Sequence, residues 1–182
     1  MKKILVPLAD GFEEIETMAI IDVLRRAGLE VTVAGVKAGE LVGSHRIRVV
    51  PDTVLEKVMS EEFDLVVLPG GQPGVDNLRK DARVLDILKK MDEKKKMIGA
   101  ICAAPLVLRD AGLIEGRTLT SYPGIESELK NACYLETRVV VDGNLITSRG
   151  PGSAIEFSLK LVEMLLGREK AGEISKALLA VT

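Results

Sequence analysis

The sequence predicts a single α/β domain in which helices cover both faces of a mainly parallel β-sheet. Three observations predict it: short aliphatic runs without polar alternation, amphipathic stretches between them, and Gly or charged residues at the boundaries. Strands that are apolar on both faces need helices on either side of the sheet to bury them. With 182 residues, the chain is long enough for one domain, residues 1–182, with its own hydrophobic core.

The four clearest strand candidates are short, rich in aliphatic residues and bounded by Gly or charge. They are KKILVPLA (2–9), EVTVAGV (30–36), FDLVVLPGG (63–71) and KMIGAIC (96–102). The segment HRIRVVPD (45–52) is predicted to be a strand or one arm of a hairpin. A second hairpin is predicted within 134–150, because Asp142-Gly143 stands between two strand-like runs.

Helices are predicted between these strands and at the end of the chain. Their ranges are 12–28, 74–95, 103–112 and 152–167, and the tail to Thr182 is expected to form one more. Asp10 followed by Glu13 suggests a capping box for the first helix, and Gly28 after two arginines suggests its end. We therefore expect helices to alternate with strands along the chain.

The composition argues against several classes of partner. A net charge of −2 and only 3% aromatic residues offer neither a basic field nor a stacking surface, so no nucleic-acid partner is expected. No run approaches the length of a membrane span, and the N-terminal apolar run is too short for a signal peptide, so we expect a cytoplasmic protein. Two cysteines and one histidine predict neither a disulfide framework nor a metal site, and we expect no cofactor.

Cys102, in MIGAICAAP (97–105), stands where a predicted strand ends and a predicted helix begins. In parallel α/β sheets, ligands bind beyond the carboxyl ends of the strands. The free N–H groups and partial positive charge of a helix N-terminus favour a thiolate, and Pro105 suits the first turn of such a helix. Cysteine is also among the most frequently buried residues, so position alone leaves a reactive thiol and a structural core residue equally open.

Glu16 favours the reactive thiol. At 100° per residue it shares one sector of the first helix with Ile20, Val23 and Ala27, whereas Glu14 points to the opposite side. A buried carboxyl has a raised pKa and can donate a proton, so a protonated Glu16 can hydrogen-bond a thiolate from an adjacent strand end. The alternative is that Glu16 lies close enough to the helix start to be solvated.

The glycines of LPGGQPG (68–74) supply a third part of the expected site. Gly70 and Gly71 let the backbone approach a ligand closely, and their N–H groups, with that of Ala103, can bind an oxyanion. An ordinary strand-to-helix turn is the alternative interpretation of the same residues. The spacing of a phosphate-binding loop is absent.

Four motifs in this order, ADGFEEIE, LPGG, AICAAP and TSRGPG, make the chain resemble the ThiJ/PfpI superfamily nearly from end to end. The resemblance is to the branch of the Parkinson-associated protein and its bacterial relatives. It implies a flavodoxin-like three-layer sandwich, as in class I glutamine amidotransferases, and a homodimer. It also implies a nucleophile at Cys102, a partner glutamate at Glu16, and oxyanion amides at Gly71 and Ala103.

The same resemblance places further residues in or near the pocket. These are Gly70, Tyr122, Arg149, Pro151 and, close to the dimer interface, His45. Two departures from the family pattern argue against proteolysis. Peptidase-like members carry histidine directly after the cysteine, where this chain has Ala103. The Parkinson-associated protein carries a histidine in the segment matching TSYPG, where this chain has Tyr122, a poor base at neutral pH. Cys133 has no helix-start context and is predicted to be structural.

These features together predict a cofactor-independent enzyme that acts on reactive α-oxoaldehydes such as methylglyoxal, or on early glycation adducts. In this interpretation the Cys102 thiolate adds to the aldehyde and Glu16 moves protons. A second interpretation is a redox-sensing stress-response protein or chaperone in which Cys102 is oxidised. A third, a cysteine peptidase, lacks the adjacent histidine.

Overall fold

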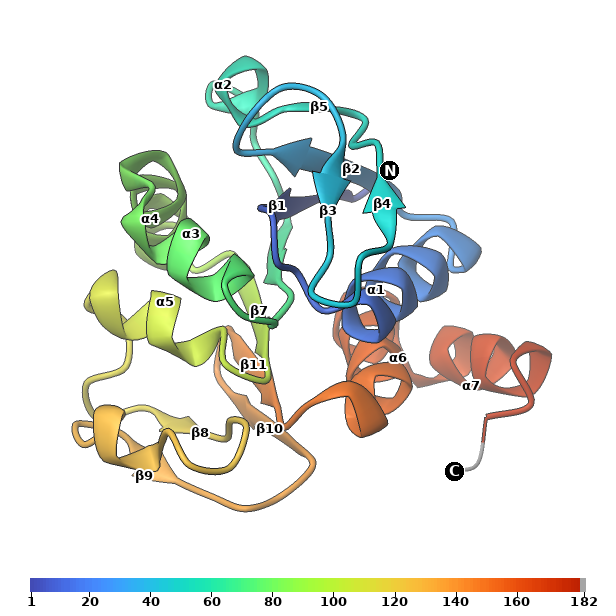
Figure 1. Cartoon of the computed structure of the whole chain (residues 1–182). Coiled ribbons are helices and arrows are strands. Elements are labelled where there is room, and N and C mark those ends of the chain that lie inside the picture. Colours follow the sequence, from blue (N-terminus) through green and yellow to red (C-terminus); the bar gives the residue numbers. More distant parts are fainter. Residues whose placement is uncertain (181–182) are drawn as a thin grey trace.

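The computed structural model describes residues 1–180 as one sheet between two layers of helices (Figure 1). The seven strands of the sheet lie in the order β10-β11-β7-β6-β1-β2-β5. All neighbouring pairs are parallel except β10 and β11, which form an antiparallel hairpin at one edge. The predicted three-layer α/β sandwich is confirmed.

The strands are short and largely buried. Those of the main sheet are β1 (Lys3–Leu8), β2 (Glu30–Gly35), β5 (Thr53–Val54), β6 (Leu65–Leu68), β7 (Met97–Ile101), β10 (Val139–Asp142) and β11 (Leu145–Ser148). Two small sheets pair β3 (Leu41–Val42) with β4 (Arg48–Val49), and β8 (Thr118–Leu119) with β9 (Cys133–Tyr134). The β3–β4 pair is antiparallel, so 45–52 supplies a hairpin arm as predicted.

Two groups of helices cover the sheet. The helices are α1 (Glu14–Arg26), α2 (Leu55–Val58), α3 (Gly74–Lys80), α4 (Ala82–Glu93), α5 (Pro105–Asp110), α6 (Ala154–Leu166) and α7 (Arg168–Ala177), with short 3₁₀ turns η1 (Glu126–Glu128) and η2 (Pro151–Ser153). Helices α1, α6 and α7 pack together on one side, and α3, α4 and α5 pack together on the other (Figure 1). None of the helices found between residues 1 and 180 has the length and apolar character that crossing a membrane requires.

The strand sequences explain why the sheet lies in the centre. Every residue of β6 is buried, because its Leu and Val side chains project into both helical layers. In β7, Gly99 leaves room for the fully buried ring of Phe157 from α6, and a Cβ atom at this position would lie 3.1 Å from that ring. The close approach of α6 to β7 therefore depends on a glycine in the strand.

The first helix begins later than its sequence predicts. Its N-cap is Glu13, whose carboxylate accepts a hydrogen bond from the N–H of Glu16 at 2.7 Å. Asp10 does not cap it; the Asp10 carboxylate accepts from the N–H of Val42 and pairs with Lys37. The reason is the turn at Gly11, which has a φ of +87° and packs against the loop before α3, so the helix cannot start until that turn is complete.

The predicted helix over 74–95 is two helices. Asp81 has an extended backbone (φ −86°, ψ 108°) that ends α3, and its side chain accepts from the N–H of Arg83 to cap α4. An aspartate at this position competes with the helical hydrogen-bond pattern, which explains why one periodic segment divides there.

Candidate active site

Cys102 lies directly after β7, at the edge of the sheet where the parallel strands end. Its φ of +63° is in the left-handed region, which a residue with a side chain occupies at a cost. Two backbone hydrogen bonds hold it there: its N–H donates to the carbonyl of Ser148 at 3.0 Å, and its carbonyl accepts from the N–H of Tyr122 at 2.8 Å. Helix α5 (Pro105–Asp110) follows within the predicted range 103–112, with Pro105 in its first turn as predicted.

Glu16 is fully buried in the first turn of α1, as the helical spacing predicts. Its Oε2 accepts a hydrogen bond from the N–H of Gly70 at 2.7 Å, whereas its Oε1 has no partner within residues 1–180. Gly70 separates Glu16 from Cys102: a Cβ atom there would lie 2.5 Å from the Cβ of Cys102 and 2.7 Å from Oε2 of Glu16. Only glycine allows the carboxyl and the thiol to share this site.

Burial raises the pKa of Glu16 to about 7. The hydrogen bond from Gly70 and the neighbouring thiol oppose this effect, and the negative charge of Glu13 adds to it. A carboxyl with this pKa is divided between its protonated and ionised forms at neutral pH. It can therefore accept and donate a proton in the same reaction cycle.

The thiol differs from its sequence-based expectation. Burial and the negative charge of Glu16 together raise the pKa of Cys102 to about 12, and the amides of Gly71 and Ala103 oppose this rise. The expected lowering by the helix start is thus outweighed, because the thiol is enclosed and faces an acid. The sulfur ionises readily only when Glu16 takes up the proton.

The two predicted oxyanion amides meet at the sulfur. The N–H groups of Gly71 and Ala103 both favour a negative charge at this position through hydrogen bonds. Gly71 has a φ of +95°, and a Cβ atom on it would lie 2.6 Å from the carbonyl oxygen of Gly11. This conformation aims its N–H at the thiol and excludes any other residue.

The remaining predicted pocket residues divide into two groups. Tyr122 is half-exposed and its ring packs against Gly150, beside the Glu16 carboxyl; Pro151 begins the 3₁₀ turn that follows. Arg149 points elsewhere, since its guanidinium donates to the carbonyl of Glu136 at 3.0 Å. His45 pairs with Glu14, its Nδ1 lying 2.9 Å from Oε2, and makes no hydrogen bond to Cys102 or Glu16 within the described part of the chain. Cys133 is an exposed residue of β9.

Sequence reasoning missed the roles of two glutamates. Glu13 caps α1 and places a negative charge beside Glu16. Glu14, predicted to point away from the core, is buried because the loop before β4 folds over the start of α1. Acidic residues just before a helix commonly serve as its N-cap, so the sequence did contain a signal for the role of Glu13. Nothing in the local sequence indicated that the loop before β4 would cover Glu14.

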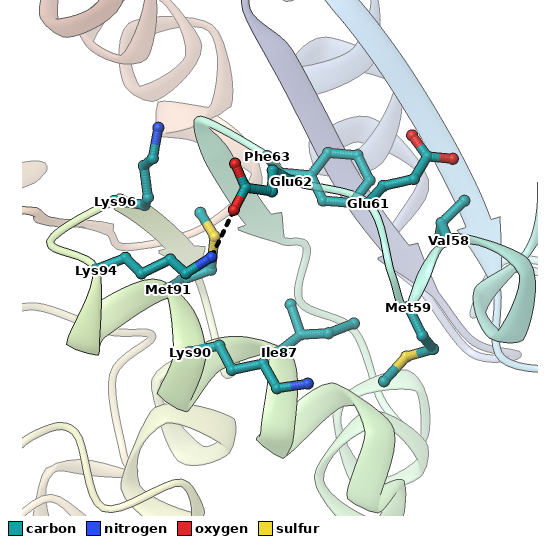
Figure 2. A pocket seen from close by; sticks show the side chains of 10 residues that line it. All are labelled: Val58, Met59, Glu61, Glu62, Phe63, Ile87, Lys90, Met91, Lys94 and Lys96. Atoms are coloured by element: carbon teal, nitrogen blue, oxygen red, sulfur yellow. Dashed lines mark hydrogen bonds and ion pairs between the residues drawn. The ribbon is translucent and has the colours of Figure 1, made fainter.

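Two cavities lie away from the thiol. One, of about 60 Å³, is lined by Phe63, Met91 and Lys96 among others (Figure 2). Phe63 lies just before β6, Met91 on α4 and Lys96 just before β7, so this cavity lies at the end of the strands opposite to Cys102. The other is a groove of about 700 Å³ between α6 and α7. Neither includes Cys102 or Glu16 among its lining residues.

Comparisons with known proteins agree with this fold. The chain matches the DJ-1/PfpI family over residues 2–164. It is 49% identical to protein dj-1beta of Drosophila melanogaster over 181 residues, 98% of this chain and 97% of that protein. It is 39% identical to glutathione-independent glyoxalase DJR-1.2 of Caenorhabditis elegans, covering 96% and 94% of the two chains.

Solved structures give the same result. The crystal structure of Drosophila melanogaster DJ-1beta superposes with a TM-score of 0.97 at 47% identity, covering 100% of this chain and 99% of that one. Oxidized DJ-1 of Toxoplasma gondii superposes with a TM-score of 0.95 at 40% identity, and both chains are fully covered. By sequence and by fold, the chain belongs to the DJ-1/PfpI family.

Proposed function

We propose that this protein is a cofactor-independent enzyme that converts reactive α-oxoaldehydes such as methylglyoxal into hydroxy acids. The observation that carries the proposal is the buried pair of Glu16 and Cys102, with the amides of Gly71 and Ala103 at the sulfur. The relative named a glutathione-independent glyoxalase supports the reaction class. Early glycation adducts, which contain the same oxidised carbon pair, are the second substrate class we propose.

The first step is addition of the sulfur to the aldehyde carbon. Glu16, ionised in part at neutral pH, takes the proton of the Cys102 thiol as the carbon–sulfur bond forms. The aldehyde oxygen becomes an oxyanion, which the N–H groups of Gly71 and Ala103 stabilise. Protonation of this oxygen gives a hemithioacetal. A nucleophile that is neutral at rest suits a reactive aldehyde better than an amide.

The second step moves hydrogen between the two carbons. The proton on the former aldehyde carbon leaves, and a proton is returned to the neighbouring carbon, so that the ketone becomes an alcohol and the hemithioacetal becomes a thioester. Oε1 of Glu16, which has no partner within residues 1–180, is the atom we assign to carry this proton. Water then cleaves the thioester, releasing the hydroxy acid and the thiol.

The direct test is lactate formation from methylglyoxal by the purified chain without glutathione. We expect catalytic turnover, because the thiol of Cys102 takes the place of the thiol of glutathione. Lactate formation that requires added glutathione, or that stops after one equivalent, would contradict the proposal.

A redox role for the same thiol is the second candidate, and the oxidized Toxoplasma gondii relative favours it. Peroxide converts a thiolate first to a sulfenate and then to a sulfinate, with one molecule of peroxide reduced at each step. The amides of Gly71 and Ala103 and a protonated Glu16 can bind the sulfinate oxygens.

Mild peroxide treatment followed by peptide mass spectrometry tests this role. If Cys102 is the sensor, it gains two oxygen atoms before the exposed Cys133 does, although Cys133 is more accessible. Oxidation of Cys133 first, or of both at one rate, would contradict a sensor at Cys102.

We further propose that the chain forms a homodimer through the layer of α1 and α6. Ile15 and Met18 on α1 and Ile155 on α6 are exposed apolar side chains, and the groove between α6 and α7 opens on the same layer. Light scattering should give about twice the chain mass of 19.6 kDa.

Two single substitutions test whether this surface, and not another exposed apolar surface, forms the dimer interface. Ile15→Lys should shift the protein toward monomer. Val141→Lys on β10, which replaces another exposed apolar residue at the sheet edge, should not. A monomeric wild type, or dissociation by both substitutions, would contradict this interface.

A further inference from the structure

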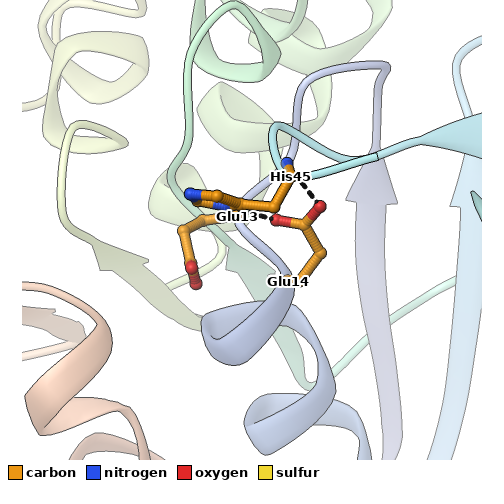
Figure 3. A group of neighbouring side chains, drawn as sticks. All are labelled: Glu13, Glu14 and His45. Carbon is orange, nitrogen blue, oxygen red and sulfur yellow. Dashed lines mark hydrogen bonds and ion pairs between the residues drawn. The ribbon is translucent and has the colours of Figure 1, made fainter. Parts of the chain in front are cut away.

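His45, Glu13 and Glu14 form a compact group of potential metal ligands at the start of α1 (Figure 3). One ligand atom from each residue lies within 4.8 Å of the others. Two helix-start carboxylates and a loop histidine, about 30 residues apart in sequence, are brought together because the β3–β4 hairpin folds over α1. The proposed reaction at Cys102 uses none of these side chains as a reacting group.

Glu14 is held in one orientation. Its side chain is 6% exposed, and Oε1 accepts hydrogen bonds from the backbone N–H groups of His45 at 2.6 Å and Ile47 at 3.4 Å. Oε2 faces Nδ1 of His45 at 2.9 Å and the hydroxyl of Ser44 at 3.1 Å. Backbone and hydroxyl contacts of this kind orient a metal-binding carboxylate before the ion arrives.

Glu13 adds a second carboxylate with a free oxygen. Glu13 is buried, with 7% of its surface exposed, and its Oε2 caps the helix by accepting a hydrogen bond from the N–H of Glu16. Oε1 accepts no hydrogen bond within residues 1–180. Binding a cation through Oε1 therefore does not require the helix cap to break.

We propose that His45, Glu14 and Glu13 bind one divalent transition-metal ion, with zinc the best match. Imidazole nitrogen and carboxylate oxygen are its usual ligands, at about 2.0–2.2 Å, and three protein ligands leave a position for water. The ion takes the place of the proton between Nδ1 of His45 and Oε2 of Glu14. The three ligand atoms already lie within 4.8 Å of one another, so only a small approach closes them on the ion.

The electrostatics of the resting group agree with this assignment. The buried carboxylate of Glu14 lies 2.9 Å from Nδ1 of His45 and attracts a positive charge at that position. A carboxylate oxygen of Glu13 lies within 4.8 Å of the ligand atoms of both residues and adds a second negative charge. A divalent cation satisfies both carboxylates more completely than one proton does.

The test uses isothermal titration of ZnCl2 into the protein carrying Cys102→Ser and Cys133→Ser, which removes thiols as competing ligands. We expect one zinc ion per chain in this background and no comparable binding of MgCl2, which prefers oxygen ligands and retains its water. His45→Gln should weaken zinc binding at least about ten-fold, as expected for the loss of one ligand. The His45 side chain is largely exposed, so this substitution leaves the core unchanged.

Two further variants distinguish the loss of a zinc ligand from the loss of a negative charge elsewhere on the protein. Glu13→Gln, added to the same background, should also weaken zinc binding. Glu126→Gln is the matched control, because Glu126 likewise accepts hydrogen bonds from a backbone N–H but lies outside the group, and it should bind as the background does. Absence of zinc binding in the background, or equal affinity after His45→Gln, would overturn the proposal.

Discussion

Replacing Cys102 with serine is expected to lower lactate formation from methylglyoxal by about 1,000-fold or more, as loss of a nucleophile does in other enzymes. A serine hydroxyl in the same buried position ionises far less readily than a thiol, and burial already raises the pKa of the thiol. In the variant, the hydroxyl of the serine therefore keeps its proton instead of passing it to Glu16, and no covalent adduct with the aldehyde forms. The measurement is enzymatic determination of lactate without glutathione.

Cys133→Ser is the matched control for this experiment. It makes the same sulfur-to-oxygen change at the exposed cysteine of β9 and should leave turnover at the wild-type level. Equal activity in the two variants would show that the sulfur of Cys102 takes no part in the reaction. A folded Cys102→Ser protein, checked by circular dichroism, excludes loss of structure as the cause.

Glu16→Gln is expected to separate ionisation of the thiol from turnover. Removing the negative charge of Glu16 removes one of the causes that raise the pKa of Cys102, so the thiol should titrate at lower pH. Alkylation of Cys102 near pH 8 should become at least about ten-fold faster, since a fall of one in pKa changes the thiolate fraction ten-fold. Turnover should nevertheless be lost, because Gln cannot accept the proton.

The same variant predicts a difference in stability with pH. Glu16 has a folded pKa of about 7 against an ordinary value of 4.5, so the folded state holds a proton that the unfolded state has released between these values. Wild-type stability therefore falls as pH rises from 4.5 to 7. Relative to Glu16→Gln, the loss should be on the order of 3 kcal/mol.

Alkylation rates across pH and urea unfolding at pH 4.5 and 7 measure the two effects. Two results would contradict a buried, proton-carrying Glu16: an unchanged alkylation profile in Glu16→Gln, or a stability difference that does not change with pH. Retained lactate formation in the variant would show that another group moves the proton.

The sequence alone predicted the architecture, which the structure confirms, and the proposed pair of Glu16 and Cys102. Runs such as LVVL in β6 are apolar on both faces, and only burial between two layers accommodates them. The helical spacing of Glu16, Ile20 and Val23 placed a carboxyl on the buried side of α1. These signals are local and periodic, so they can be recognised without knowing which strands are neighbours in the sheet.

The tertiary structure decided what the local patterns could not express. The start of α1 depends on Gly11 packing against the loop before α3, and the burial of Glu14 depends on a hairpin that follows it by about 30 residues. The pKa of Cys102 depends on how closely Glu16 and the amides of Gly71 and Ala103 surround it. The sequence predicted Cys102 as the reactive thiol, but the direction of its pKa shift came from burial and from a charge on another helix, because electrostatic effects follow distance in space.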